Sequence, residues 1–163
     1  IINRPTISSE TSCCTEEENT FIVLETSTMN FTFYLKLYLL TIPVFFLIDM
    51  VWLGWIAKNF YRNHLGHLMA EEVNWMAALV FYLLYIIGII FFAVSPALEK
   101  GDWQIALLYG VLFGFFTYAT YDLTNWATLK DWSATVVFAD IAWGMFLGGT
   151  VATASFFIGK WLT

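Results

Sequence analysis

Charged residues are scarce in this chain. Only 12% of its 163 residues are Asp, Glu, Lys or Arg, whereas 60% are hydrophobic and 20% are aromatic. A soluble domain carries roughly twice that share of charge, so the composition argues against a protein surrounded by water. No basic run or patch is present, which excludes binding to nucleic acid through the phosphate backbone.

Cysteine is almost missing as well. Cys13 and Cys14 are adjacent, which is neither a metal-ligand spacing nor a disulfide framework. Nucleophile motifs, phosphate-binding loops and zinc-protease signatures are also absent. The sequence therefore names no cofactor and leaves open whether the protein is an enzyme.

What the sequence does contain is four long apolar blocks. Each is long enough to cross the hydrocarbon core of a bilayer as an α-helix. Backbone groups in lipid must be satisfied within their own segment, and the alternation typical of transmembrane strands is absent. The sequence therefore predicts an all-α fold in the lipid bilayer, a four-helix transmembrane bundle with antiparallel neighbouring spans at about residues 33–57, 75–94, 103–129 and 132–158.

The connections between these blocks are short except for one polar loop, Lys58 to Asn74. Ser95-Pro96 is expected to stop the second span, because proline interrupts a helix. Lys130-Asp131 is expected to form a tight turn between the third and fourth spans. Lysine and arginine are equally divided between the two membrane faces, so the positive-inside rule gives no orientation.

The first 28 residues differ from the rest of the chain. They are rich in Ser, Thr and Glu and lack the basic and apolar regions of a signal peptide. Met29 stands directly before the first apolar block. We expect residues 1–28 to be a disordered leader upstream of the true start at Met29, and residues 29–163 to form the four-span membrane domain.

Glycines recur at a spacing of four in the last two blocks. Gly110 and Gly114 share one face of the third span, and Gly144 and Gly148 share one face of the fourth. Small residues at this spacing let two helix backbones approach closely. With the tight turn between them, these two spans are expected to form a closely packed hairpin.

Three aspartates lie inside the predicted spans: Asp49, Asp122 and Asp140. Counted at 1.5 Å per residue, each lies roughly 12–13 Å from the same membrane face. A carboxylate at such depth costs about 2.5–3.5 kcal/mol on insertion scales, and no Lys, Arg or His lies deep in a span to pair with it. If the three converge, they must share protons, bind a cation or face water.

The neighbours of these aspartates are aromatic or polar. On the third span, Tyr118 and Asn125 are expected to share a face with Asp122, and four threonines broaden this polar stripe, which should face the bundle interior. Interhelical hydrogen bonding alone would explain one such acid, but three at one depth favour a functional pocket. The predicted binding pocket consists of Asp49, Trp52, Tyr118, Tyr121, Asp122, Asn125, Asp140 and Trp143.

Three functions are compatible with this pattern. The first is binding or transport of a proton, cation or small ligand at the aspartates, in a homo-oligomer because four spans are few for a transporter. The second is a membrane enzyme acting on a lipid or other apolar substrate, with an aspartate as general acid or base and His64 and His67 as metal ligands, helped by Glu71 or Glu72. The third is an accessory subunit that docks another membrane protein.

Several stretches resemble a known family of membrane proteins. They are Ile48–Gly54, Phe60–Arg62, Leu65–Leu68, Phe81–Tyr85, Tyr118–Asn125, Ala127–Lys130 and Asp140–Gly144. From Leu35 to about Phe157 the chain resembles domain-of-unknown-function family 2177, with the stretch around Asp122 the most specific part. The resemblance implies a four-span protein of the bacterial inner membrane, and it implies no activity, because the family has none assigned.

Overall fold

The computed structural model describes the backbone of residues 11–163 and, apart from Ile56, the side chains of residues 31–163. This part of the chain is helical and contains no strand. The chain divides into two compact units, Ile1–Lys36 and Leu37–Thr163. All the predicted site residues belong to the second unit, which the following paragraphs describe by itself.

Helices account for nearly all of the described backbone. They are α1 (Thr11–Val51), the π-helix η1 (Trp52–Ala57), α2 (Lys58–Leu65), α3 (Trp75–Ile89), the π-helix η2 (Ile90–Val94), α4 (Ser95–Lys100), α5 (Trp103–Thr128) and α6 (Ala134–Leu162). Four stretches are long and apolar enough to cross a membrane: Phe31–Trp55, Trp75–Lys100, Trp103–Thr128 and Ala134–Leu162. The predicted helical bundle with four spans is confirmed.

The second span is longer than predicted. Ser95-Pro96 does not stop it, because α3 continues through η2 into α4 and ends at Lys100. Pro96 lies directly after the π-helix η2, in the first turn of α4, so the continuous helix changes its hydrogen-bond pattern just before the residue that lacks an N–H. The actual break is Gly101, whose positive φ of 69° closes the C-terminus of α4.

The first helix begins earlier than predicted. α1 has a helical backbone from Thr11, where a disordered leader was expected. Extending an existing helix adds one hydrogen bond for each residue that it fixes, whereas starting a new one is costly. Residues 1–10 and the side chains of residues 11–30 lie outside the described part of the chain, so a leader upstream of a start at Met29 remains a prediction.

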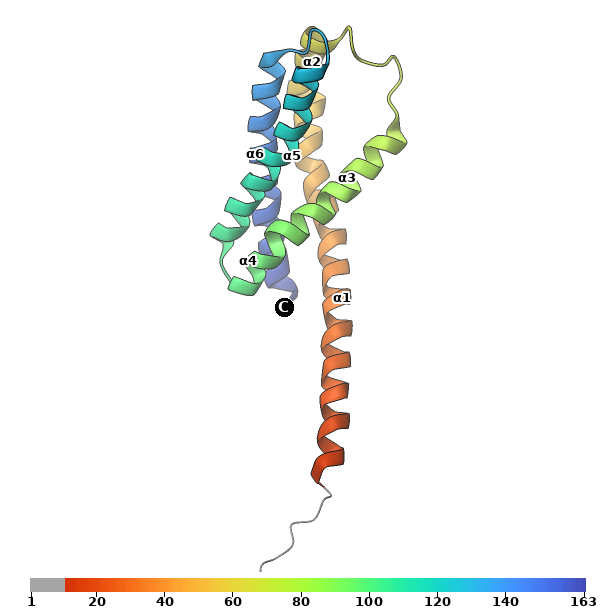
Figure 1. The fold of residues 1–163 in the computed structure, drawn as a ribbon, viewed down its shortest axis with the longest axis vertical. Coiled ribbons are helices and arrows are strands. Elements are labelled where there is room, and N and C mark those ends of the chain that lie inside the picture. Colours follow the sequence, from red (N-terminus) through yellow and green to blue (C-terminus); the bar gives the residue numbers. More distant parts are fainter. Residues whose placement is uncertain (1–10) are drawn as a thin grey trace, which may run out of the picture. The chain divides into compact units, whose positions relative to one another are not determined.

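Polar residues set the ends of the later spans. The side chain of Asn74 accepts a hydrogen bond from the backbone N–H of Ala77, and that of Asp102 accepts one from Gln104, which caps α3 and α5. Asp131 has a φ of 57°, a conformation that Asp tolerates better than most residues. The predicted tight turn between α5 and α6 is therefore present, at the same end of the unit as α2 (Figure 1).

The closest helix packing joins α5 and α6. A Cβ added to Gly114 would collide with the backbone of Gly144, and one added to Gly110 would collide with that of Gly148. This order of contacts is the one expected when two helices run in opposite directions. The predicted close packing of this hairpin is confirmed, and its glycines are explained by backbone contact.

The part of α1 in this unit buries one face. Leu37, Thr41, Phe45 and Asp49 recur every four residues, and all four are buried. Thr41 shares a buried hydrogen bond of 3.0 Å with Ser155 of α6. The ring of Phe45 packs against Tyr82 and Tyr85 of α3, so this face of α1 contacts both α3 and α6.

Candidate functional site

All three intramembrane aspartates are buried. Their side chains come from three helices: Asp49 of α1 is 3% exposed, Asp122 of α5 is 0% exposed and Asp140 of α6 is 8% exposed. Each of these helices is otherwise strongly apolar. The carboxylate is buried because it lies on the side of its helix that faces the other helices. Full burial of carboxylates at these positions is the first observation that distinguishes them from the exposed acids of the loops.

Asp140 is held by a residue from outside the spans. The hydroxyl of Tyr61, on α2, donates a hydrogen bond of 2.5 Å to Oδ1 of Asp140. The ring N–H of Trp52 in turn donates to the Tyr61 hydroxyl at 3.4 Å. Burial, together with the bond to Asp140, raises the pKa of Tyr61 well above its usual value, so this hydroxyl stays a proton donor at physiological pH.

Asp122 lies next to Asp140 but has no hydrogen-bond partner of its own. The two carboxylates interact electrostatically, and Asp122 also interacts with Tyr61. Both oxygens of Asp122 are buried without a protein hydrogen bond. The indole N–H of Trp132 is close enough to interact with Asp122 but falls outside hydrogen-bond geometry, so it too is unpaired.

Asp49 occupies a second position, linked to the first through aromatic side chains. It interacts with Tyr82 of α3 and Trp143 of α6, while its Oδ2 has no hydrogen-bond partner of normal geometry. Tyr118 of α5 interacts electrostatically with both Asp49 and Asp140. We use the name carboxylate pair for Asp122 and Asp140, and treat Asp49 as a neighbour of that pair.

Two tryptophans join these positions. The rings of Trp52 and Trp143 are stacked, with centroids 4.5 Å apart and planes 7° from parallel. Trp52 of η1 follows Asp49 by three residues, and Trp143 of α6 follows Asp140 by three, so the two rings meet between these helices. The indole N–H of Trp143 is another buried donor without a hydrogen-bond partner.

Two predicted pocket residues lie differently. Tyr121 is 61% exposed and packs edge-on against Trp132. It is the residue next to Asp122, about 100° away around the helix, which turns it out of the face that Asp122 shares with Tyr118. Asn125 is half-buried, and its backbone carbonyl accepts the hydrogen bond that ends α5.

Three of the four threonines of α5 face outward, contrary to expectation, whereas Thr117 is half-buried and interacts with Tyr85. Thr120, Thr124 and Thr128 are exposed, and each hydroxyl donates to the carbonyl four residues earlier. A threonine that satisfies its hydroxyl within its own helix does not need the bundle interior. The prediction from the polar residues of α5 therefore buried more of this helix than the structure does.

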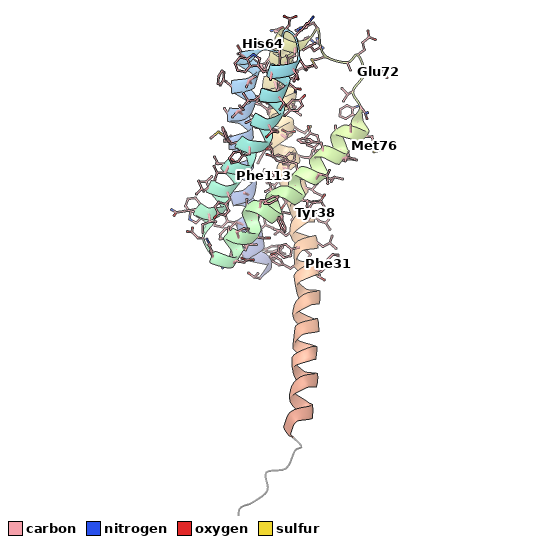
Figure 2. All side chains as sticks on the ribbon, viewed as in Figure 1. Phe31, Tyr38, His64, Glu72, Met76 and Phe113 are labelled. Atoms are coloured by element: carbon pink, nitrogen blue, oxygen red, sulfur yellow. The ribbon has the colours of Figure 1, made fainter. Side chains whose placement is uncertain are left out.

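The two histidines proposed as metal ligands lie outside the carboxylate pair. His64 is on α2, near the connection between α5 and α6 (Figure 2), and its Nδ1 lies 2.9 Å from the carbonyl of Phe60. His67 is exposed in the following loop. Among the side chains that the structure describes, no group of three or more His, Cys, Asp or Glu could hold a metal ion.

Tyr61 is the residue that the sequence interpretation missed. In the sequence it lies within the polar loop Lys58 to Asn74, and the predicted pocket does not include it. Ala57, Tyr61 and Leu65 recur every four residues and face inward, whereas Lys58 and Arg62 are exposed. This spacing was the available signal that one face of α2 packs onto the bundle.

The described side chains around the aspartates supply no compensating positive charge. None of the interactions of the three carboxylates described above involves a Lys, Arg or His side chain. Two surface grooves, with volumes of about 650 and 660 Å³, are lined mostly by apolar residues of α1 and of η2 with α5, and contain no aspartate. The carboxylates therefore lie inside the bundle and away from these grooves.

Four apolar helices with buried carboxylates between them define a multi-pass membrane protein. The family model described as "Predicted membrane protein (DUF2177)" matches residues 34–157. The chain belongs to this family. Searches of curated proteins and of solved structures gave no match.

Proposed function

We propose that this membrane protein reversibly binds a proton at the carboxylate pair, Asp122 and Asp140. The observation that carries the proposal is that Asp122 is fully buried beside a second carboxylate, with both of its oxygens unpaired. Intramembrane acids tend to mark ion or proton pathways. A proton shared between the two groups supplies the positive charge that no basic side chain provides.

The electrostatics support a shared proton. Two carboxylates this close in a low-dielectric interior repel each other when both are ionised, so they titrate as a coupled unit. Tyr61 donates to one oxygen of Asp140, which stabilises negative charge on that residue. The bond thus favours Asp122 as the member of the pair that carries the proton.

The chain's treatment of other buried polar groups argues against a purely structural role. Thr41 and Ser155 are fully buried and satisfy each other with a hydrogen bond. Asp122 is equally buried and makes no such bond. An acid that only held helices together would be expected to pair in the same way, because leaving a buried polar group unpaired costs about 1–3 kcal/mol.

Infrared difference spectroscopy of the protein in lipid nanodiscs tests the proposal. Spectra taken at stepped pH should show a protonated carboxyl band that shifts in deuterated water and disappears reversibly. Asp122→Asn should remove this band. Asp131→Asn is the matched control, because Asp131 is exposed in the turn between α5 and α6.

The same spectra distinguish the bound species. If Na⁺, K⁺ or another small cation removes the band at constant pH, the cation competes with the proton for the pair. A protein without any Asp122-dependent carboxyl signal, with or without cations, would refute the proposed site.

A further inference from the structure

We infer that the carboxylate pair exchanges protons with only one of the two aqueous phases, the one on the α2 side, and that Tyr61 is the gate. This inference rests on the proposed proton site. It adds a direction of access and names the residue that controls it.

On the α2 side, a side chain of a short helix contacts the carboxylate pair directly. α2 lies at the end of the unit where α5 and α6 are connected (Figure 1). Tyr61 reaches from this helix to Asp140, and its hydroxyl also accepts a hydrogen bond from Trp52 at the long distance of 3.4 Å. Breaking the bond to Asp140 would uncover a carboxylate close to water.

The segments on both sides of α2 allow such movement. It is joined to the first span by the π-helix η1, and π-turns within helices are frequent at functional sites. It is followed by residues 66–74, which are exposed. α2 also has only eight residues, so a small rotation about η1 is enough to withdraw Tyr61.

Toward the opposite face, the buried side of α1 continues from Asp49 to an apolar side chain. Phe45 lies one helical turn before Asp49 on the buried face of α1. Its ring centroid lies 5.6 Å from the ring centroids of both Tyr82 and Tyr85. Beyond it, the Thr41 hydroxyl donates to the backbone carbonyl of Leu37 and shares a hydrogen bond with the hydroxyl of Ser155. We call Phe45, Tyr82 and Tyr85 the aromatic layer.

The glycine seam closes the same direction between α5 and α6. Backbone contact at Gly110 with Gly148 and at Gly114 with Gly144 excludes a water column along this interface. Proton transfer through the protein toward that face would need hydrogen-bonded oxygens in sequence. The hydroxyls of Tyr82 and Tyr85 interact with Asp49. On the buried face of α1, however, Phe45 lies between Asp49 and Thr41 and supplies no such oxygen.

The groups that face the pair are known from each neighbouring helix. Tyr61 faces it from α2, Tyr118 lies on α5 and interacts with Asp140, and Asp49 on α1 is linked through Tyr118. Tyr82 and Tyr85 of α3 interact with Asp49 rather than with the pair. Any titration of the pair therefore includes these groups, and none of them is basic.

Proton uptake by oriented vesicles tests the inference. Vesicles holding one protein each are separated by capture of a tag placed after Thr163, and the external pH is lowered while a dye reports proton uptake. We expect Asp122-dependent uptake only when the α2 side faces the acidified phase. Tyr61→Phe should speed this uptake by about tenfold or more without changing its side, because a hydrogen bond to a charged group is lost.

Variants of the aromatic layer provide the second arm. Phe45→Ala should allow uptake from both sides, and the milder Phe45→Leu is used if the alanine variant does not fold. Leu47→Ala is the matched control on α1, because Leu47 is exposed on the outer side of the helix. Tyr38→Phe is the control for Tyr61→Phe, because the Tyr38 hydroxyl donates to a backbone carbonyl of α3.

The outcomes separate the two proposals. Asp122-dependent uptake by the wild-type protein from both sides, or only from the side opposite α2, would overturn the inference and leave the proton site intact. A Tyr61→Phe rate equal to that of the wild type would overturn the role of Tyr61 as the gate. Uptake that does not depend on Asp122 in any orientation would instead remove the proposed function.

Discussion

Buried polar side chains in this protein fall into two groups. Thr41 and Ser155 are joined to each other by a hydrogen bond, whereas Asp122 makes none. The first arrangement stabilises the contact between α1 and α6. The unpaired Asp122 lowers the stability of the fold, but it is a group that can change its protonation state. Functional sites commonly contain such destabilising residues.

This difference gives a prediction for stability. Asp122→Asn removes a buried acid and supplies an amide N–H that can donate to Asp140. We expect the variant to raise the free energy of unfolding in detergent by about 1 kcal/mol while abolishing the pH response. A loss of stability of similar size would instead show that Asp122 holds the bundle together.

Tyr61 gives a prediction with a defined pH dependence. Tyr61→Phe should lower the free energy of unfolding by about 1–2 kcal/mol at neutral pH, because the bond to Asp140 is lost. The raised pKa of Tyr61 means that the unfolded protein ionises this group first, so the advantage of the wild type is complete below about pH 10 and declines above it.

Unfolding curves of both proteins between neutral and strongly alkaline pH check this. A difference in stability that stays constant through pH 10 and above would contradict the assignment of a raised pKa to Tyr61. Tyr38→Phe again serves as the control, because the Tyr38 hydroxyl donates to a carbonyl and not to a carboxylate.

At the scale of the elements, glycine has two different roles. Gly114 lies against the backbone of Gly144, whereas a Cβ added to Gly54 in η1 would meet no atom within 4 Å. The same amino acid is therefore essential for packing in α5 and spatially unconstrained in η1. Residue type alone does not distinguish these roles, although the paired spacing in α5 and α6 does.

Alanine substitutions at these two glycines should behave oppositely. Gly114→Ala should lower the free energy of unfolding by about 1–3 kcal/mol, because the added methyl group forces two backbones apart. Gly54→Ala should leave it unchanged or raise it by up to about 1 kcal/mol, because alanine favours helix. Thermal unfolding in detergent measures both, and equal effects would contradict the packing of α5 on α6.

The elements that sequence reasoning located well are those defined by length and composition. Spans are long apolar runs, so their existence followed from the cost of unpaired backbone groups in lipid. The extension of the second span past Pro96 did not follow, because a π-helix before proline leaves no mark in composition. The inward face of α2 was missed for a related reason, since eight residues give too few turns for a clear period.

For the whole molecule, the site was predicted in part. The burial of Asp49, Asp122 and Asp140 could be inferred from their depth, because each lies within an apolar run. Which of them are neighbours depends on how the helices rotate against one another, and the outward position of Tyr121 shows that sequence spacing does not determine this. The contact of Tyr61 with Asp140 could not be predicted, because it depends on where α2 packs against the bundle.

The four spans also predict the placement of the connections. α2 and the turn between α5 and α6 should lie on one side of the membrane, and the turn after α4 on the other. In a chain with Cys13 and Cys14 replaced by serine, cysteines at Asn63 and Lys130 should react with an impermeant reagent from the same side, and one at Lys100 from the opposite side. Reaction of Asn63→Cys and Lys130→Cys from opposite sides would contradict the four-span arrangement.

The π-helix η1 has a consequence for how this protein tolerates changes in length. Removing one residue from a helix rotates everything after it by about 100° relative to what precedes it. A single deletion within η1 would leave the other three spans intact, yet it would turn Tyr61 away from Asp140 and bring an exposed neighbour such as Arg62 toward the bundle. The contact between Tyr61 and Asp140 therefore depends on how far α2 is rotated about the helix axis relative to the first span. We expect a deletion in η1 to change this rotation more than a substitution does.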